Sequence, residues 1–348
     1  MIVDKDYCCS SYLVFREVVG DRMFHKDAII KRQSKYGHDS KRFTISTSHE
    51  VERHIEDTLA KNKDKKMALL LSGGMDSGLL ASFMQGYDAY TFRFLNGEFA
   101  KEELKRAEKF AAINHMNLHY VDIEWGRIEH CIDELMINKG SPIHSIEPQI
   151  YLSATQALKN NVELMVIGDG ADFAFGGLDQ LVSKDWNYDE FVSRYTYLNP
   201  SLVLKNPVKM DKVFQQYRLP NDKIDYKTIV FDTLAPNESY ESYANAFNTA
   251  SLDYIDPYAD LYLDKIDLDR IRSGESKYII RELFKRRYGF EAPEKIPMPR
   301  PVDFYFEEWE GPRRTEFKEN LDMKDFTGNQ KWQMWCLERF LELYYRFL

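Results

Sequence analysis

One stretch decides the fold of this chain: Met67-Ala68-Leu69-Leu70-Leu71-Ser72-Gly73-Gly74-Met75-Asp76-Ser77. It is a continuous apolar run that ends in a polar break with two glycines. Short apolar runs bounded by charge and glycine are typical of buried parallel strands. We therefore predict a strand over residues 67–71 and a helix over residues 78–85, which stops at Gly86.

The same alternation continues along the chain. Further strands are predicted at 89–94, 118–122 and 163–167, with amphipathic helices at 102–115 and 147–159 between them. Upstream, Ser48 is a good N-cap for a helix with Val51, Ile55 and Leu59 on one face. This order predicts an α/β fold with a doubly wound parallel sheet and right-handed crossovers.

The sequence divides into three parts. Residues 1–48 have no clear period and are expected to form an N-terminal extension, irregular or with a small β element. Residues 49–185 are expected to be a nucleotide-binding α/β core. Residues 186–348 are aromatic-rich and are expected to be mostly helical, for example at 277–287 and 332–347. Because no long linker separates the two large parts, we expect them to pack closely.

Composition excludes several classes of protein. The 348 residues are 44% hydrophobic and 30% charged, which is typical of an ordinary globular protein. The net charge of −9 argues against a protein that coats a nucleic-acid backbone or an anionic membrane. Asp4, Lys5 and Asp6 stand where a signal peptide would be apolar, so we expect a cytoplasmic protein without membrane contact.

The cysteines give no sign of a structural or catalytic site. Cys8 and Cys9 are adjacent, whereas Cys131 and Cys336 stand alone. Neither a disulfide framework nor a CxxC metal site can be assembled from this spacing. We expect reduced, packed thiols.

A second glycine-rich break, Gly168-Asp169-Gly170-Ala171-Asp172, follows the strand predicted at 163–167. In parallel sheets of this kind ligands bind at the carboxyl ends of the strands, so both breaks are expected to face one crevice. The first break suits a phosphate group that its backbone N–H groups can approach. It lacks the lysine of a Walker loop, which favours pyrophosphate retained as a leaving group. Asp76 is explained if Mg²⁺ bridges it to phosphate oxygens.

These residues carry a family resemblance. Residues 72–77 resemble the PP-loop of the ATP pyrophosphatases, and residues 168–177 resemble the second signature of the asparagine synthetase family. Weaker similarities lie at 256–260, 277–281 and 332–343, so the likeness covers roughly residues 48–348 and concerns the synthetase domain. The resemblance implies an adenine nucleotide alpha hydrolase-like fold with ATP and Mg²⁺ as cofactors.

The resemblance also implies roles. Members of the family adenylate a substrate carboxylate, and a nitrogen nucleophile then displaces AMP. Asp76 and Asp172 would bind Mg²⁺, and Asp169 would stand where the family has a glutamate that assists amine deprotonation. The nucleotide and its pyrophosphate would be held by Leu71, Ser72, Gly73, Gly74, Ser77, Thr91, Phe92 and Gly168, with Thr91 and Phe92 beside adenine. The alternative is that the glycines only make a tight turn and that Asp169 and Asp172 only stabilise a turn through hydrogen bonds to the nearby backbone.

Three departures qualify this expectation. Glutamine-dependent members of the family have a catalytic cysteine at position 2, where this chain has Ile2. About 48 residues precede the synthetase-like part, and we expect these to be too few for a glutaminase domain. Nitrogen would come from free ammonia, an amine or a separate ammonia-supplying protein. Asp169 replaces the family's glutamate, and Phe173 replaces an acid.

The third departure concerns a lysine. The family places it just after a Pro-Glu-x-Ile segment, where this chain has Pro301 beside Arg300. Arg300 or Lys295 could supply the missing charge, although an arginine is planar and bidentate. Arg300 could equally be a surface residue. His144 and Glu147 could line an acceptor pocket or serve turns and caps.

The sequence therefore favours an ATP-dependent amide-forming ligase that acts on a small-molecule carboxylate and on ammonia or an amine. Two alternatives stay open. One is another PP-loop enzyme that adenylates nucleic acid, although nucleic acid is an unlikely partner for so acidic a chain. The other is a nucleotide-binding subunit or pseudoenzyme that depends on a partner.

Overall fold

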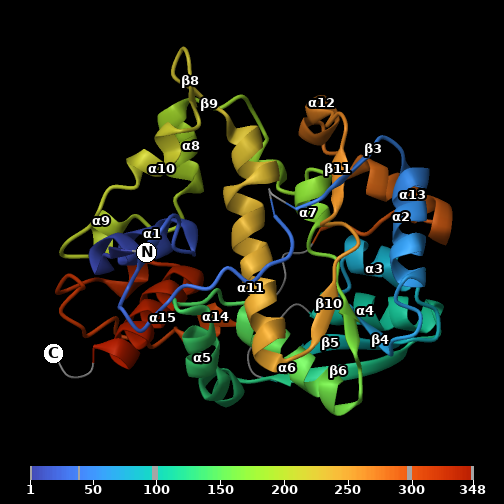
Figure 1. Ribbon diagram of the computed structural model, residues 1–348, viewed down its shortest axis with the longest axis horizontal. Helices are drawn as coiled ribbons and strands as arrows, with labels where there is room; N and C mark the ends of the chain where they lie inside the picture. Colours follow the sequence, from blue (N-terminus) through green and yellow to red (C-terminus); the bar gives the residue numbers. More distant parts are fainter. Residues whose placement is uncertain (1, 38–39, 96–100, 296–299, 346–348) are drawn as a thin grey trace.

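The computed structural model describes residues 2–37, 40–95, 101–295 and 300–345. Its centre is a parallel sheet of five strands in the order β10-β7-β4-β5-β6 (Figure 1). The strands are β4 (Met67–Leu70), β5 (Asp88–Phe94), β6 (Asn117–Ile123), β7 (Leu164–Val166) and β10 (Asp253–Ile255). The predicted doubly wound α/β class is confirmed.

The chain reverses its direction of travel across the sheet at β4. From β4 it moves outward through β5 to β6, and it then returns to place β7 and β10 on the other side of β4. The switch point therefore lies between β4 and β7. The two glycine-rich breaks follow these two strands, so they leave the sheet side by side, as the sequence predicted.

Both faces of the sheet are buried, because successive side chains of a strand point to opposite faces. In β4, Ala68 and Leu70 belong to one core cluster, and Met67 and Leu69 belong to the other. The first face is covered by α5 (Trp125–Lys139), α6 (Glu147–Lys159) and α11 (Leu234–Ala250). The second is covered by α2 (Ser48–Ala60), α3 (Met75–Ala81), α4 (Lys101–Ile113) and α13 (Tyr278–Tyr288).

A largely helical portion packs on the far side of α11 from the sheet (Figure 1). It contains α15 (Gly328–Tyr344), whose Trp332, Cys336 and Phe340 are in the same core cluster as β4. Its other helices are α8 (Tyr188–Tyr195), α9 (Pro200–Val203), α10 (Asp211–Gln215) and α14 (Val302–Tyr305). The shared core confirms the expected close packing of the two large parts.

The remaining short elements lie around the sheet and the helical portion. They are α7 (Ala171–Ala174), α12 (Leu268–Arg272), the 3-10 turns Asp179–Leu181 and Met323–Asp325, the π-turn Thr228–Asp232, and the paired strands β1 (Ile2–Val3) with β2 (Arg22–Met23), β3 (Phe43–Ile45) with β11 (Leu261–Leu263), and β8 (Arg218–Leu219) with β9 (Lys223–Ile224).

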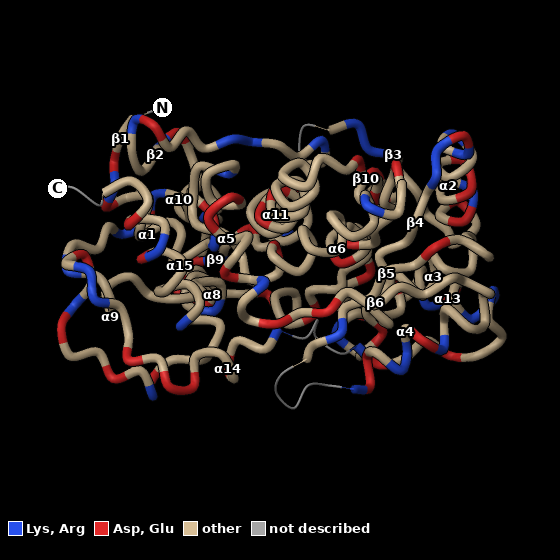
Figure 2. The backbone as a smooth tube through the Cα atoms, turned by 90° about the horizontal axis from the view of Figure 1, so that it is seen from below, with Lys and Arg blue, Asp and Glu red and all other residues tan. Residues whose placement is uncertain are grey.

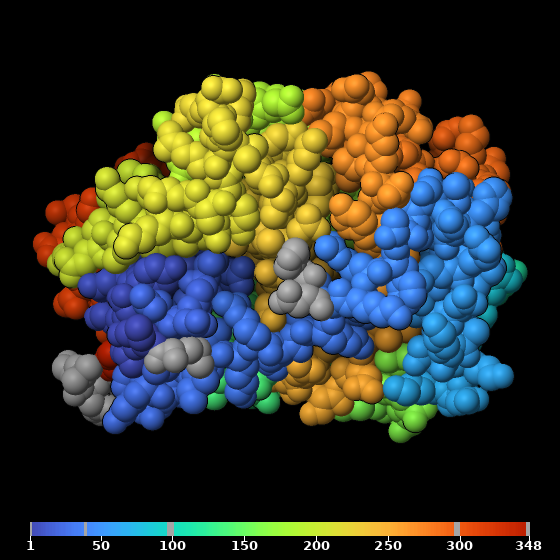
Figure 3. Space-filling model, turned by 45° about the horizontal axis from the view of Figure 1, so that its top comes forward, coloured from blue at the N-terminus to red at the C-terminus, as the bar shows by residue number. Residues whose placement is uncertain are grey.

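The N-terminal residues correct one expectation. They form an eleven-residue helix, α1 (Lys5–Phe15), which the sequence missed because eight of its residues are buried and leave no polar face to set a period. The chain then extends across the molecule toward α2 (Figure 3). There the backbone N–H of Gln33 donates to Glu241 of α11 at 2.8 Å. The N-terminal segment is therefore part of the packed structure.

Two smaller predictions were also wrong, and the third part of the chain adds a strand to the sheet. The N-cap of α2 is Thr47, which forms a capping box with Glu50, and Ser48 is the first helical residue. The helix after β4 begins at Met75, inside the motif, and ends at Ala81. The part of the chain expected to be mostly helical supplies β10, a strand whose three residues are too few to show a period.

Two further features bear on function. In the described ranges there is no helix long and apolar enough to cross a lipid bilayer. Lys and Arg alternate with Asp and Glu along the helices around the sheet, for example in α2 (Figure 2). A surface that binds a nucleic-acid backbone would carry a continuous stripe of Lys and Arg, and the mixed charge of these helices is not of that kind.

Candidate functional site

The first break forms a tight loop between β4 and α3. Gly73 has a φ of +82°, and a Cβ there would lie 2.2 Å from the carbonyl oxygen of Glu103, so only glycine fits. The Oγ atoms of Ser72 and Ser77 lie 3.1 Å apart, and the N–H of Ser72 donates to Ser77 Oγ at 3.2 Å. These contacts fold the loop back on itself at the end of the strand.

The second break follows β7 and leads into α7. A Cβ on Gly170 would lie 2.5 Å from the backbone nitrogen of Ala259, so the absence of a side chain lets the two backbones approach. The N–H of Gly170 donates to Asp256 Oδ2 at 2.6 Å. Asp256 is 1% exposed and thus ties the second break to the segment after β10.

The two breaks meet at one ammonium group. Lys277 Nζ lies 2.6 Å from Asp76 Oδ2 and 2.5 Å from Asp172 Oδ1. The lysine side chain is 4% exposed, whereas those of Asp76 and Asp172 are 22% and 29% exposed. Lys295 Nζ is also 2.9 Å from Asp172 Oδ1. The aspartates predicted to bind magnesium are therefore brought together, with two lysines beside them.

Burial and charge act against each other in this cluster. Burial alone would raise the pKa of Asp172, but the ammonium groups of Lys277 and Lys295 lower it to about 2. Burial raises the pKa of Asp76 despite Lys277. Burial would lower the pKa of Lys277, and the two carboxylates raise it instead. The lysine is therefore charged at neutral pH, and Asp172 is ionised.

The donor set fits a magnesium ion bound together with phosphates. Asp76 Oδ1 is buried and has no hydrogen-bond partner in the structure. Mg²⁺ commonly takes one or two protein carboxylates and completes its shell with phosphate oxygens and water. No cluster of three or more His, Cys, Asp or Glu side chains that could hold a metal alone occurs in the described part of the chain. Asp76 and Asp172 could hold the ion only with help from a ligand.

Asp169, in the second break, contacts Ser239 of α11. Its Oδ2 accepts a hydrogen bond from Ser239 Oγ at 2.8 Å. Burial, followed by the nearby Asp256, raises the pKa of Asp169 well above its usual value. Burial also raises the pKa of Asp256 to about 7. A carboxylate with a raised pKa is a better proton acceptor than an ordinary aspartate.

The two candidates for the missing lysine are separated. Lys295 belongs to the aspartate cluster, where its Nζ also donates to the carbonyl of Gly177 at 3.0 Å. Arg300 instead contacts His144 Nε2 at 3.2 Å and Ser145 Oγ at 3.3 Å. Ile296, the end of the Pro-Glu-x-Ile segment, lies outside the described residues.

A profile of the asparagine synthase family matches residues 47–248, which is more than half of the chain. The chain belongs to the asparagine synthase family. The family places it among the ATP-utilising, adenylating enzymes of the PP-loop type. The match starts at Thr47, the N-cap of α2, and ends within α11.

Similarity to individual proteins is weak. A U34-tRNA thiolase, NcsA, from Methanococcus maripaludis, with a [4Fe-4S] cluster, has a TM-score of 0.34 and 12% identity over 84% of this chain and 79% of its own. An NMN synthetase from Francisella tularensis has a TM-score of 0.28 and 11% identity over 72% of this chain and 96% of its own. An NAD⁺ synthetase from Burkholderia pseudomallei has a TM-score of 0.22 and 14% identity over 61% of this chain and 88% of its own. Scores this low support no argument about function. No curated protein matches the sequence.

The asparagine synthase resemblance suggested four further nucleotide contacts. Thr91 and Phe92 lie inside β5, which continues to Phe94, and their place beside adenine stays a prediction. Thr91, Phe92 and Leu71 are 3%, 9% and 0% exposed. Gly168 leaves room for Leu80 and Tyr258, each 3.2 Å from the Cβ it lacks.

Four residues of the site had no assigned role in the sequence. Lys277, Asp256 and Tyr258 lay in segments noted only for their resemblance to asparagine synthetases, and Ser239 had no signal. The Tyr258 hydroxyl donates to the carbonyl of Asp76 at 3.1 Å. All four come from the second half of the chain, and each contacts one of the two breaks. Lys277 is the first residue of the segment 277–281, so the resemblance of that segment to the family was a signal that could have identified it.

Proposed function

We propose that this protein is an ATP-dependent amide-forming ligase. It adenylates the carboxylate of a small-molecule acid, releases pyrophosphate, and transfers the acyl group to ammonia or an amine. The observation that supports this most directly is the meeting of Asp76 and Asp172 on Lys277 at the carboxyl ends of β4 and β7. Membership of the asparagine synthase family supports the same chemistry.

The residues of the two breaks would act on the phosphates. The backbone of residues 72–77 would hold pyrophosphate as it leaves, because glycines let N–H groups approach an anion. Lys277 and Lys295 would add positive charge beside it. Mg²⁺, held by Asp76 and Asp172, would supply further stabilisation of the charge that develops on the leaving group.

Asp169 would act in the second half of the reaction. An attacking amine must lose a proton, and Asp169 Oδ1 or Oδ2 can accept it. The raised pKa of Asp169, caused first by burial, matches this role. Ser239 would position the carboxylate through its 2.8 Å hydrogen bond to Oδ2.

Pyrophosphate release tests the proposal. The purified protein is incubated with MgATP, ammonium and a panel of carboxylic acids, and the nucleotide products are identified. We expect AMP and pyrophosphate with at least one acid. Asp76→Asn should lower turnover by orders of magnitude, whereas Asp57→Asn, on the exposed side of α2, should leave it unchanged.

The other outcomes favour different functions. ADP and phosphate as products would contradict the proposal. Turnover that requires an added tRNA would indicate a nucleic-acid substrate. Nucleotide binding without turnover, restored by a glutaminase partner, would indicate a partner-dependent subunit.

A further inference from the structure

A cavity of about 300 Å³ lies between α7, the first half of α11 and β11 (Figure 1). Its other walls are the π-turn Thr228–Asp232 and the N-terminal segment at Gly37 and Arg42. The described residues that line it include none of the aspartates and lysines of the proposed magnesium site. The cavity is therefore a separate site, and its volume suits a small organic molecule.

Much of the cavity wall is apolar. Phe173 and Tyr240 are each 7% exposed, and their rings pack edge to face with centroids 5.4 Å apart. Leu261 and Leu263 of β11 are 2% and 6% exposed and also line the space. Phe173 is the residue at which this chain replaces an acid of the asparagine synthase family. A wall of this kind suits the apolar body of a ligand.

The Tyr240 side chain adds a polar group to this wall. Although the residue is buried, its hydroxyl has no hydrogen-bond partner among the described residues. Burial, followed by the carboxylates of Asp256 and Asp169, raises the pKa of Tyr240 well above its usual value, so the hydroxyl keeps its proton. Buried hydroxyl groups in folded proteins are normally hydrogen bonded, and a ligand in the cavity would complete this one.

The polar side of the cavity has a surplus of negative charge. Asp225 and Asp232 are half-buried there, and Arg42 Nη1 lies 2.8 Å from Asp232 Oδ1. Asp225 accepts hydrogen bonds from the N–H of Thr228 at 3.2 Å and from its Oγ1 at 2.7 Å. It forms no ion pair within the described part of the chain, so its carboxylate has no counter-charge.

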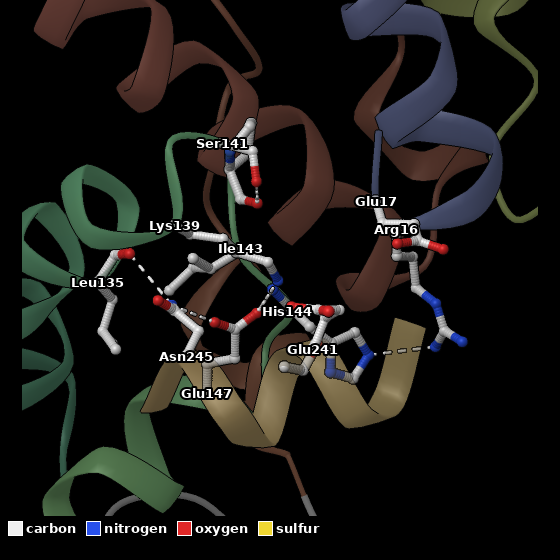
Figure 4. Close-up of polar contacts among 12 residues, drawn as sticks. Arg16, Glu17, Leu135, Lys139, Ser141, Ile143, His144, Glu147, Glu241 and Asn245 are labelled. Carbon is white, nitrogen blue, oxygen red and sulfur yellow. Dashed lines mark hydrogen bonds and ion pairs between the residues drawn. The ribbon is translucent and has the colours of Figure 1, made fainter. Parts of the chain in front are cut away.

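A buried carboxylate elsewhere in the chain shows the contrast. Glu147 is fully buried, with Lys139 Nζ 2.6 Å from its Oε1 and Asn245 Nδ2 donating to Oε2 at 2.7 Å (Figure 4). Glu147 is thus balanced within the protein and is a structural support. At the rim of the cavity, Lys227 and Asp264 are exposed and contribute one charge of each sign. The lining therefore keeps one net negative charge.

We propose that this cavity binds an organic amine, a cation with an apolar body. Asp225 supplies the counter-charge, the Tyr240 hydroxyl supplies a hydrogen-bond acceptor, and the aromatic rings attract the cation and cover its apolar part. The cavity already holds one such contact, since the Arg42 guanidinium lies 5.0 Å from the centroid of the Tyr262 ring. The walls at 37–42 and 259–266 lie outside residues 47–248, the part matched by the family. The proposal goes beyond the proposed function and does not depend on it.

Calorimetry with phenethylamine tests the site. This amine is protonated at neutral pH, and it is titrated into the purified protein without ATP. Its controls are 2-phenylethanol, which has the same ring and chain without the charge, and ammonium chloride, which has the charge without the apolar body. We expect the amine to bind at least about 10-fold more tightly than either control, and equally well when MgATP is present. Absence of phenethylamine binding, equal binding of the alcohol, tighter binding of the anion 3-phenylpropanoate, or competition by MgATP would overturn the proposal.

Variants of the lining place the amine in this cavity. Asp225→Asn should weaken phenethylamine binding by at least about 10-fold, and Tyr240→Phe should weaken it by about 3- to 10-fold. Arg42→Met removes a competing cation, so it should strengthen amine binding by about 2- to 10-fold, whereas it would weaken the binding of an anion. Asp57→Asn, on the exposed side of α2, is the control and should bind as wild type does.

The variants also provide the contrary results. Unchanged binding in both Asp225→Asn and Tyr240→Phe, or weaker amine binding in Arg42→Met, would overturn the proposal. Circular dichroism checks that each variant folds, and Tyr240→Phe, which removes one hydroxyl, decides the matter if Asp225→Asn does not fold. Because no turnover is measured, amine binding without pyrophosphate release from any acid would support this site and contradict only the proposed function.

Discussion

Lys277 Nζ lies 2.6 Å from Asp76 Oδ2, although the two residues are 201 positions apart in the chain. The lysine is almost fully buried and also contacts Asp172 at 2.5 Å. Lys277 therefore joins helix α13 to both glycine-rich breaks. Gly177 makes this possible, because a Cβ there would lie 1.9 Å from Asp172 Oδ1 and 2.1 Å from Lys277 Cε.

Removal of this ammonium should make stability depend on magnesium. Lys277→Met leaves two partly buried carboxylates close together, with only Lys295 beside Asp172. We expect a loss of about 3–5 kcal/mol in the free energy of unfolding without metal, and a larger recovery with Mg²⁺ than wild type shows. Urea denaturation with and without Mg²⁺ measures both. Lys285→Met is the control, since its exposed pair with Glu291 should cost less than about 1 kcal/mol. Equal metal responses of Lys277→Met and wild type would count against the metal site.

A matched pair of glycines tests the close approach at the first break. Gly73 and Gly86 have φ values of +82° and +79°, but a Cβ on Gly86 would meet nothing within 4 Å. Gly86→Ala should cost about 1 kcal/mol, from the left-handed backbone alone. Gly73→Ala should cost at least about 3 kcal/mol, because the added Cβ would collide with the backbone of α4. Chemical denaturation compares the two. Similar losses would show that the loop can move away from α4.

Asp169 should affect only the second half of the reaction. Asp169→Asn cannot accept a proton, so amide formation should fall by about 100-fold or more while ATP–pyrophosphate exchange with the acid substrate continues. Loss of both activities in a folded variant would place Asp169 in the adenylation step instead. Asp179→Asn, in the 3-10 turn after α7, is the control and should leave both activities intact.

Ser239→Ala gives a pH signature for the same group. The Ser239 hydrogen bond lowers the pKa of Asp169, although burial raises it more. Without that bond the pKa should rise further, and the base must be deprotonated to act. The acidic limb of the pH–rate profile for amide formation should therefore move to higher pH. A profile that keeps its position would mean that Asp169 is not the base.

Glu103 should make the protein less stable as pH rises. Its side chain is 7% exposed with Oε2 unpartnered, and burial raises its pKa from 4.5 to about 8. The folded protein thus holds a proton that the unfolded chain releases between pH 4.5 and 8, so stability falls across this window. Glu103→Gln should remove this loss and stabilise the protein by roughly 1–3 kcal/mol at pH 9. Denaturation at pH 5 and 9 tests it, with the exposed Glu102→Gln as control, which should show no such pH-dependent gain.

The sequence was informative where structure is local. The apolar run at 67–71 determined a buried strand, and the strand preceding Gly168 did the same, since short apolar runs bounded by glycine have few other solutions. The N-terminal helix was missed for the opposite reason. Most of its residues are buried, so it lacks the alternation of polar and apolar faces by which a surface helix is identified.

By itself the sequence determined the class of sheet, the succession of its first four strands along the chain and the two glycine-rich breaks, because these follow from neighbouring residues. Only the tertiary structure decided that Lys277 lies between Asp76 and Asp172, and that Arg16 and Arg300 meet at His144. The two residues of each of these contacts are more than a hundred positions apart, and the contacts depend on which helices pack against the sheet. Such packing depends on contacts between residues that are far apart in the chain, so it cannot be predicted from a local sequence pattern.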